Sequence, residues 1–135
     1  MALIGKKIFI VEDNLQNRVI FQMILMNKGA HVDFERRGKG AIWHLRNAMH
    51  VDLIVMDLML MDGVTGFDLY DEIRAIPQFA DVPIVAVSAM DSSIAIPLVQ
   101  AKGFNAFIAK PIDKYLFPEQ IDEIMNGEKL WFAGV

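Results

Sequence analysis

The chain has 135 residues, of which 54% are hydrophobic and 22% charged, so we expect a single globular domain rather than a disordered chain. Its net charge of −4 argues against a general binder of nucleic acids or of anionic membranes. Because it has no cysteine, no apolar stretch long enough to span a membrane and no signal-peptide pattern, we expect a cytoplasmic protein without disulfide or thiolate chemistry.

The amino-terminal part predicts a strand followed by a helix. Residues 7–11, KIFIV, form a short apolar run that is typical of a buried strand. The segment NLQNRVIFQMILMNKG predicts a helix that begins near Asp13 or Asn14 and ends near Gly29. Its inward side chains are expected to be Val19, Ile20, Met23, Ile24 and Met26.

Further strands and helices follow in alternation. The strands are expected at residues 30–34, 53–56, 84–87 and 106–109. The helices are expected at residues 39–48, 66–76 and 114–125. Two of the strands, LIVM and IVAV, are continuous apolar runs of the kind that a parallel sheet buries on both faces. The alternation therefore predicts an α/β fold with a parallel sheet, helices on both faces and right-handed crossovers.

Pro97 falls where another helix should connect the last two of these strands. A proline inside a helix costs about 3 kcal/mol and pushes the residue before it toward extended geometry. We therefore expect this helix to begin near Pro97, with residues 91–96 irregular and with Ile94 and Ile96 exposed.

Polar residues stand at the ends of four predicted strands, and the carboxyl ends of parallel strands share the sheet edge where ligands bind. These residues are Glu12 and Asp13, Asp57, Ser88 and, one residue beyond its strand, Lys110. Three neighbouring carboxylates repel one another, and oxygen ligands with room for phosphate suit Mg²⁺. Lys110 supplies a positive charge and Ser88 a hydroxyl, as a transferred phosphoryl group requires. Asp57 is therefore predicted to be a nucleophile that forms an acyl phosphate.

At these residues the chain resembles receiver domains of the two-component response-regulator family. The resemblance rests on the motifs IFIVEDN, LIVMDLML, PIVAVSA and AFIAKPI, in this order, and extends from Lys6 to Met125. It implies a flavodoxin-like fold of five βα units with the strand order 2-1-3-4-5. The receiver domain is expected at residues 1–126, followed by a tail at 127–135 that is strand-like or frayed, or that forms a docking or dimer surface.

The resemblance implies roles for the residues at the sheet edge. Asp57 is expected to be the phosphoacceptor, and Ser88 and Lys110 to bind the phosphoryl oxygens, with the Lys110–Pro111 peptide bond cis. The expected ligands of Mg²⁺ are Glu12, Asp13, Asp57 and the backbone carbonyl of Met59.

The resemblance also implies a switch. Ser88 is expected to move toward the phosphoryl group while Phe107 turns inward, and the fourth helix, fifth strand and fifth helix would form the output face. Met59 and Met90, each two residues beyond Asp57 or Ser88, are expected to flank the approach of water to the phosphoryl group. Because methionine positions water poorly, we expect slow hydrolysis.

One loop departs from the family pattern. Receivers usually carry proline four residues after the acceptor, where this chain has Met61, and the segment from Asp57 to Gly66 is one residue longer than usual. We therefore expect the loop at 61–66 to take an unusual path.

The expected function is that of a response regulator in a phosphorelay. Its partners would be a sensor histidine kinase or a histidine phosphotransfer protein and a downstream protein, with a homodimer possible and with no nucleic acid or membrane. The alternatives are a phosphohydrolase acting on small phosphoesters, a flavin-binding module and a phosphate-independent adaptor. The hydrolase would need a second aspartate where Met59 stands, and the flavin module a phosphate loop where VEDNLQN is acidic. The intact acidic pocket argues against the adaptor.

Overall fold

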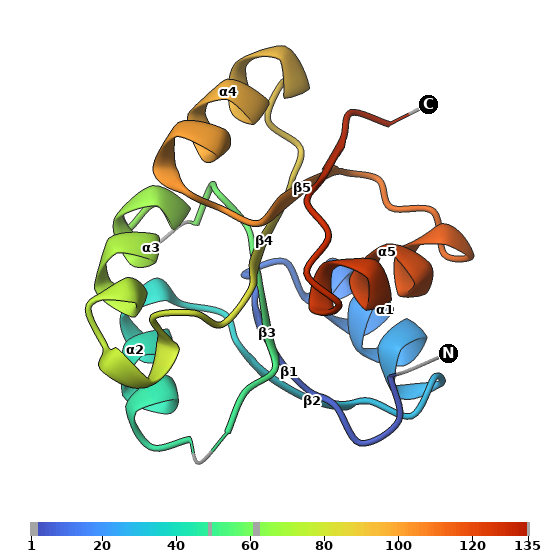
Figure 1. The fold of residues 1–135 in the computed structure, drawn as a ribbon, viewed down its shortest axis with the longest axis horizontal. Coiled ribbons are helices and arrows are strands. Elements are labelled where there is room, and N and C mark those ends of the chain that lie inside the picture. The colour runs from blue at the N-terminus through green and yellow to red at the C-terminus, as the bar shows by residue number, and fades with distance from the viewer. Residues whose placement is uncertain (1–2, 49, 61–62, 135) are drawn as a thin grey trace.

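A six-stranded parallel sheet lies between two layers of helices (Figure 1). The computed structural model describes residues 3–48, 50–60 and 63–134. Helices α1 (Leu15–Met26) and α5 (Leu116–Met125) cover one face of the sheet. The other face carries α2 (Gly38–Arg46), α3 (Gly66–Arg74) and α4 (Ser92–Lys102), and a 3-10 turn, η1 (Pro77–Phe79), follows α3.

The strands follow the predicted order and add one. They are β1 (Lys7–Val11), β2 (His31–Glu35), β3 (Leu53–Met56), β4 (Ile84–Ser88), β5 (Ala106–Ala109) and β6 (Leu130–Phe132). Their order in the sheet is β2-β1-β3-β4-β5-β6. The order 2-1-3-4-5 is therefore confirmed, but the sheet has a sixth strand, because the tail pairs with β5.

The sheet separates two apolar cores. Phe9 and Val11 of β1 point toward α2, α3 and α4, whereas Ile8 and Ile10 point toward α1 and α5. Every residue of β3 and β4 is buried, which explains why both strands are apolar without interruption. Burying one such side chain stabilises the fold by roughly 1.5–3 kcal/mol.

Helix α1 buries a different face from the one expected. Its buried side chains are Phe21 and Leu25, and the Phe21 ring lies 5.4 Å from the ring of Phe117 in α5. Of the side chains predicted to point inward, only Ile24 is half-buried, and the other four are 42% to 66% exposed. The helix is apolar on two sides, so its periodicity did not determine which side meets the sheet.

Helix α4 begins at Ser92, so the prediction of a start near Pro97 is wrong. Asp91 caps the helix, because its side chain accepts a hydrogen bond from the backbone N–H of Ser93 at 2.9 Å. Pro97 lies inside the helix and removes only the one backbone hydrogen bond that its nitrogen would donate. Burial of Ala95 and the capping bonds offset this loss.

The exposure of this segment is mixed. Ile94 is exposed, as predicted, whereas Ile96 is half-buried and packs against the core between the sheet and α4. Regular helix therefore replaces the irregular segment expected at 91–96.

Candidate functional site: an acidic pocket at the carboxyl end of the sheet

Strand register brings the predicted residues to one edge of the sheet. Val11 lies opposite Met56 in the pairing of β1 with β3, so the next residues, Glu12 and Asp57, leave their strands side by side. Ser88 ends β4 opposite Ala109 of β5, and Lys110 follows. The parallel order β1-β3-β4-β5 thus gathers residues that are far apart in the sequence.

Three carboxylates meet at this edge. Oxygen atoms of Glu12, Asp13 and Asp57 lie within 4.8 Å of one another, and among the described residues this is the one group of three or more side chains that could hold a metal ion. Glu12 is 1% exposed and Asp57 7% exposed, whereas Asp13 is half-buried. Buried carboxylates this close together require a neighbouring positive charge.

Lys110 supplies one positive charge. Its Nζ donates to Glu12 Oε1 at 2.6 Å and to Asp57 Oδ2 at 2.8 Å. Burial alone would lower the pKa of Lys110, but the bonds to Asp57 and Glu12 outweigh it and raise that pKa, so the ammonium stays charged. The Lys110–Pro111 peptide bond is cis, as predicted.

One lysine leaves the cluster short of positive charge. Burial raises the pKa of Glu12 to about 7 against the lowering effect of Lys110, and Asp57 adds to the rise. Glu12 Oε2 is buried and accepts no hydrogen bond from the described residues. A few hard oxygen donors, one of them unpaired, fit Mg²⁺, which binds through few carboxylates and keeps several waters.

The loop after β3 is pressed against the acceptor strand. The backbone N–H of Met59 donates to Asp57 Oδ1 at 3.2 Å, and the N–H of Gly66 donates to the carbonyl of Leu58 at 2.9 Å. A Cβ atom at Gly66 would lie 2.5 Å from the carbonyl oxygen of Asp57, so only glycine fits there. The path expected to be unusual falls partly on Met61 and Asp62, which lie outside the described residues.

Ser88 and Phe107 lie on neighbouring strands beside this cluster. Ser88 is buried, and its Oγ accepts a hydrogen bond from the N–H of Met90 at 3.2 Å. The backbone N–H of Lys110 donates to the carbonyl of Ser88 at 2.9 Å. Phe107 is wholly buried within β5, in the core on the α4 side, rather than among the carboxylates.

Met59 and Met90 hold equivalent places on two strand ends. Each bonds through its backbone N–H to the side chain two residues before it, Met59 to Asp57 and Met90 to Ser88. Met59 is half-exposed and Met90 is partly buried. The predicted role of both side chains in water access stays a prediction, and sequence reasoning missed the close contact of Gly66. The glycine at the start of α3 was the available signal.

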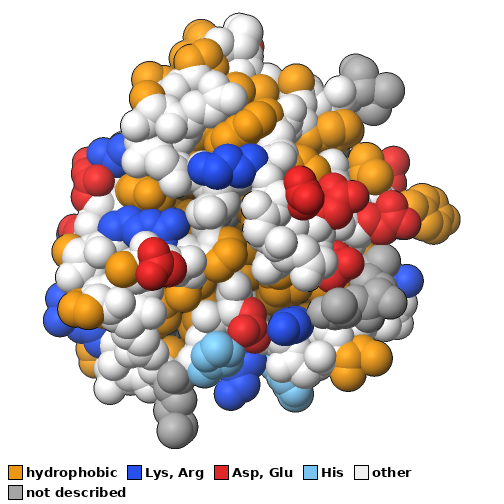
Figure 2. Space-filling view, viewed as in Figure 1, with side chains coloured by type: hydrophobic (Ala, Val, Ile, Leu, Met, Phe, Trp, Pro, Cys, Tyr) orange, Lys and Arg blue, Asp and Glu red, His pale blue; other side chains and the backbone are white. Residues whose placement is uncertain are grey.

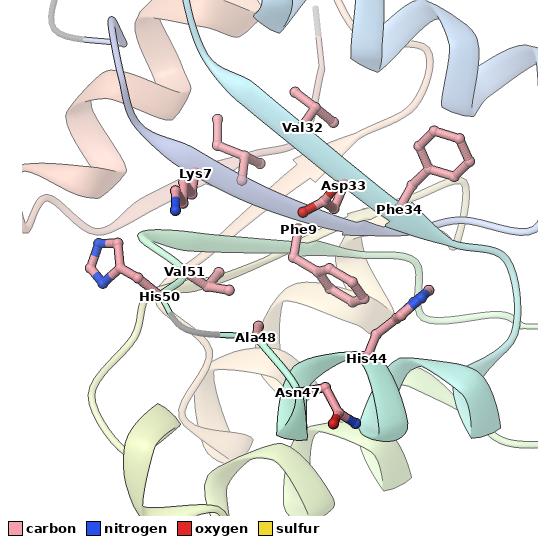
Figure 3. Close-up of a pocket in the computed structure, with 11 residues that line it drawn as sticks. Lys7, Phe9, Val32, Asp33, Phe34, His44, Asn47, Ala48, His50 and Val51 are labelled. Atoms are coloured by element: carbon pink, nitrogen blue, oxygen red, sulfur yellow. The ribbon is translucent and has the colours of Figure 1, made fainter.

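A separate cavity lies away from this edge (Figure 3). Its volume is about 380 Å³, and it opens between β1, β2 and α2. Phe9 and His44 approach each other in its wall, with ring centroids 6.0 Å apart, and Lys7 and His50 lie at one end. Lys7 begins β1, whereas Glu12 follows its end, so the cavity is not part of the acidic site.

The surface beside the site differs between its two flanks. Figure 2 shows hydrophobic side chains gathered over α4, where Ile94 and Leu98 are exposed, and acidic side chains on the side of α5. No helix among the described residues has the length and apolar character needed to cross a membrane.

Fold and site together define a class: a doubly wound parallel α/β protein with an acidic, lysine-containing pocket beyond its strands. Residues 8–122 match the family model of the response regulator receiver domain. The chain therefore belongs to the response regulator receiver family, whose members act in two-component signalling and bind Mg²⁺ in such a pocket.

Known relatives agree with this assignment. The polar-differentiation response regulator DivK of Brucella ovis is 30% identical, covering 90% of this chain and 97% of DivK. The CAI-1 autoinducer sensor kinase/phosphatase CqsS of Vibrio cholerae is 28% identical over 93% of this chain, which matches only 17% of CqsS. The receiver domain of sensor histidine kinase PA1611 from Pseudomonas aeruginosa PAO1 has a TM-score of 0.81 and 26% identity, covering 90% of this chain and 98% of that domain. That structure holds a magnesium ion in its active-site cleft.

Proposed function

We propose that this chain is a phosphoacceptor response regulator. Asp57 takes a phosphoryl group from a histidine kinase or histidine phosphotransfer protein, and the phosphorylated chain signals by binding a downstream protein. The single observation that carries the proposal is the buried Asp57 carboxylate, which holds the Lys110 ammonium at 2.8 Å among two further carboxylates. The chain also lacks cysteine, which fits action in the reducing cytoplasm.

The chemistry is a phosphoryl transfer between two side chains. A carboxylate oxygen of Asp57 attacks the phosphorus, the new P–O bond forms as the P–N bond of the phosphohistidine breaks, and the electron pair stays on the donor imidazole nitrogen. Lys110 already contacts Asp57, so its positive charge lies next to the phosphoryl oxygens on which negative charge develops during the transfer. The Ser88 hydroxyl is the proposed donor to a phosphoryl oxygen.

Magnesium is the proposed cofactor of this step. Glu12, Asp13, Asp57 and the backbone carbonyl of Met59 would hold the ion, with the unpaired Oε2 of Glu12 available to its shell. When bound, the ion supplies the positive charge that phosphoryl oxygens require. Without it, the raised pKa of Glu12 leaves the cluster partly protonated near neutral pH.

The surface next to the site favours a protein as phosphodonor. Leu15, Val19, Met23 and Met26 are exposed and lie along one side of α1, at helical spacing. This stripe begins two residues after Asp13. Exposed apolar stripes of this kind mark protein interaction sites, so we assign it to the protein that carries the phosphohistidine. A small-molecule phosphohydrolase would have no use for such a face.

Intact-mass measurement tests the proposal directly. After incubation with Mg²⁺ and a small acyl phosphate, the chain should gain about 80 Da, the mass of one phosphoryl group on an aspartyl nucleophile. Chelation of the metal serves as the control and should prevent the gain. A chain whose mass does not change under these conditions would not be a phosphoacceptor.

A further inference from the structure

The tail forms a strand on the side of the sheet nearest the phosphate-binding lysine. β6 pairs with β5 in parallel, with Ala106 opposite Leu130, Phe107 opposite Trp131 and Ile108 opposite Phe132. It therefore occupies the edge that β5 would otherwise expose between α4 and α5, as Figure 1 shows. The face that sequence analysis assigned to output thus carries a segment of the chain itself.

The side chains of β6 join both cores. Trp131 packs with Phe107 in the core on the α4 side, and both Met90 and Ile96 pack against the same core. Leu130 and Phe132 pack in the core on the side of α1 and α5. Because Phe107 and Trp131 are register partners on one face of the sheet, Trp131 covers the side of Phe107 that would face solvent in a five-stranded sheet.

Residues after β6 approach the loop that carries Lys110. Phe132, Ala133 and Gly134 line a hollow of about 720 Å³ together with Ala109, Lys110 and Pro111. The tail therefore borders both the middle of β5, at Phe107, and its end, at Lys110.

β6 is also weakly held for a strand in this sheet. It has three residues, and each of them is only half-buried, whereas every residue of β3, β4 and β5 is buried. Short edge elements with little buried apolar surface open at lower free energy than the rest of a domain. β6 is therefore suited to opening while the fold stays intact.

We propose that β6 is a regulatory strand, docked on β5 in the unphosphorylated chain and released when a phosphoryl group occupies Asp57. The proposal rests on the phosphoacceptor function proposed above. Release would uncover the edge of β5 and add Trp131 to the apolar surface over α4.

The direction of the effect follows from the order of the sheet. Asp57 follows β3, and the order onward is β4, β5, β6. A phosphoryl group on Asp57 attracts the Ser88 hydroxyl at the end of β4, whereas the Lys110 ammonium already lies 2.8 Å from Asp57. The pull on Ser88 acts toward β3, and the bond from Lys110 N–H to the Ser88 carbonyl makes the end of β5 follow the end of β4. The end of β5 is thus drawn away from β6.

Thermodynamic linkage makes the proposal measurable in two ways. If the phosphoryl group favours the open form of β6 by some factor, then opening β6 tightens binding of a phosphoryl mimic by the same factor. Couplings of this kind are commonly about tenfold. We therefore expect beryllium fluoride with Mg²⁺ to speed amide exchange at residues 130–132 about tenfold, with no change in β2, the opposite edge strand.

The variant Trp131→Ala tests the reciprocal effect. It weakens β6 without touching the acidic site, so the affinity for beryllium fluoride should rise, by up to the same factor of about ten. Phe34→Ala is the matched control, because Phe34 is a half-buried aromatic residue in β2 and packs on the other side of the sheet from Trp131. Its affinity for the mimic should equal that of the wild type.

Binding of the mimic is followed separately, by fluorine NMR of the bound species. Unchanged or slower exchange at residues 130–132 in the mimic-bound wild type would overturn the regulatory role and leave the phosphoacceptor function standing. Equal affinity changes in Trp131→Ala and Phe34→Ala would overturn it as well. If the wild type binds no mimic with Mg²⁺, the phosphoacceptor function fails, and the regulatory role fails with it. If Trp131→Ala does not fold, amide exchange at residues 130–132 of the wild type, with and without the mimic, still tests the regulatory role of β6.

Discussion

Lys110 divides its hydrogen bonds between Glu12 at 2.6 Å and Asp57 at 2.8 Å. A phosphoryl group on Asp57 offers the ammonium new oxygens, so Glu12 would lose part of its pairing when the chain is phosphorylated. A divalent cation beside Glu12 would compensate for that loss, so the proposed combination of a lysine with a metal ion keeps the carboxylates neutralised in both states.

Asp57→Asn should abolish the mass gain of about 80 Da that a small phosphodonor gives the wild type with Mg²⁺, because an amide cannot act as the acyl nucleophile. The fold should persist, since asparagine has nearly the same shape and removes one of three crowded carboxylates. Intact mass and circular dichroism check both statements. A mass gain that survived in the variant would move the acceptor to another residue.

Glu12 and Asp13 should contribute unequally to the metal. Asp13 is half-buried and near the surface, where we expect direct ligation, whereas Glu12 also holds Lys110 and is expected to act through water. In a Mg²⁺ titration, Asp13→Ala should therefore lose more affinity than Glu12→Ala. Outer ligands typically account for a factor of about 10 to 100. Equal or reversed losses would contradict this division.

Replacing Met59 and Met90 should speed dephosphorylation of Asp57. Their backbone N–H groups contact the acceptor or Ser88, and we predict that their side chains flank the path of an approaching water. The double variant Met59→Asn with Met90→Glu would supply polar groups that orient water, an effect smaller than the factor of about 100 for a general base. The decay of the phosphorylated chain in excess Mg²⁺ is the measurement, and each single variant is a control. Met59→Asn should be the larger single effect, and slower or unchanged decay in the double variant would refute the idea.

At the scale of the elements, the strands were easier to predict than the helices. LIVM and IVAV are buried on both faces, so their composition alone identifies them as strands. Helix α1 has more apolar residues than the core can bury, and only contacts with the sheet and with Phe117 select Phe21 as its inward residue. Pro97 costs helix α4 one backbone hydrogen bond. The cap at Asp91 and the burial of side chains of α4 outweigh this cost, so the helix forms from Ser92 onward.

Asp52 ties β1 to the start of β3. Its Oδ2 accepts from the backbone N–H of Lys7 at 2.8 Å, and its Oδ1 lies 2.6 Å from His50 Nε2. Burial alone would raise the pKa of Asp52, but the bonds from Lys7 and His50 outweigh it and lower that pKa below its usual value. A lowered pKa contributes stability above the unfolded value of about 3.9, and this is lost as the pH falls through the folded pKa.

Asp52→Ala should therefore lower the free energy of unfolding at pH 7 by about 1 kcal/mol, the net contribution of a typical hydrogen bond, because the bonds of Asp52 are exposed to solvent. Below a pH of about 4, the difference from the wild type should shrink, because the unfolded wild-type chain then binds a proton at Asp52 that the folded chain binds only at lower pH. Urea unfolding at several pH values measures both. A difference that stayed constant down to the acid range would show that the charge of Asp52 contributes nothing.

At the scale of the whole molecule, the site was more predictable than its surroundings. The residues at the end of each strand could be identified from the sequence. Because the strands are parallel, these ends share one edge of the sheet, where Asp57 and Lys110 meet. The close contact of Gly66 and the pairing of Trp131 with Phe107 could not be predicted from the sequence. Each depends on the distance between two segments that only the folded structure brings together. The three residues of β6 are too few for their pattern of apolar side chains to identify the strand with which they pair.

The exposed stripe of α1 should matter for a protein phosphodonor and not for a small one. Met23→Lys places a charge in its middle and should slow transfer from the histidine kinase or phosphotransfer protein about tenfold, as loss of an interface anchor typically does. Ile94→Lys is the control, since Ile94 is similarly exposed but lies on α4. Phosphorylation by a small acyl phosphate should be unchanged in both variants. Equal slowing by both lysines would indicate a general charge effect instead of docking on α1.

The close contact of Gly66 with the carbonyl of Asp57 fixes the start of α3 against the end of β3. The backbone at Gly66 packs so closely on Asp57 and Leu58 that even one added carbon would clash there, so we expect little movement on that side of the site when Asp57 is modified. The opposite side ends in a three-residue strand with half-buried side chains. When the ends of β4 and β5 shift toward Asp57, the contact that separates at least cost is therefore the one between β5 and β6.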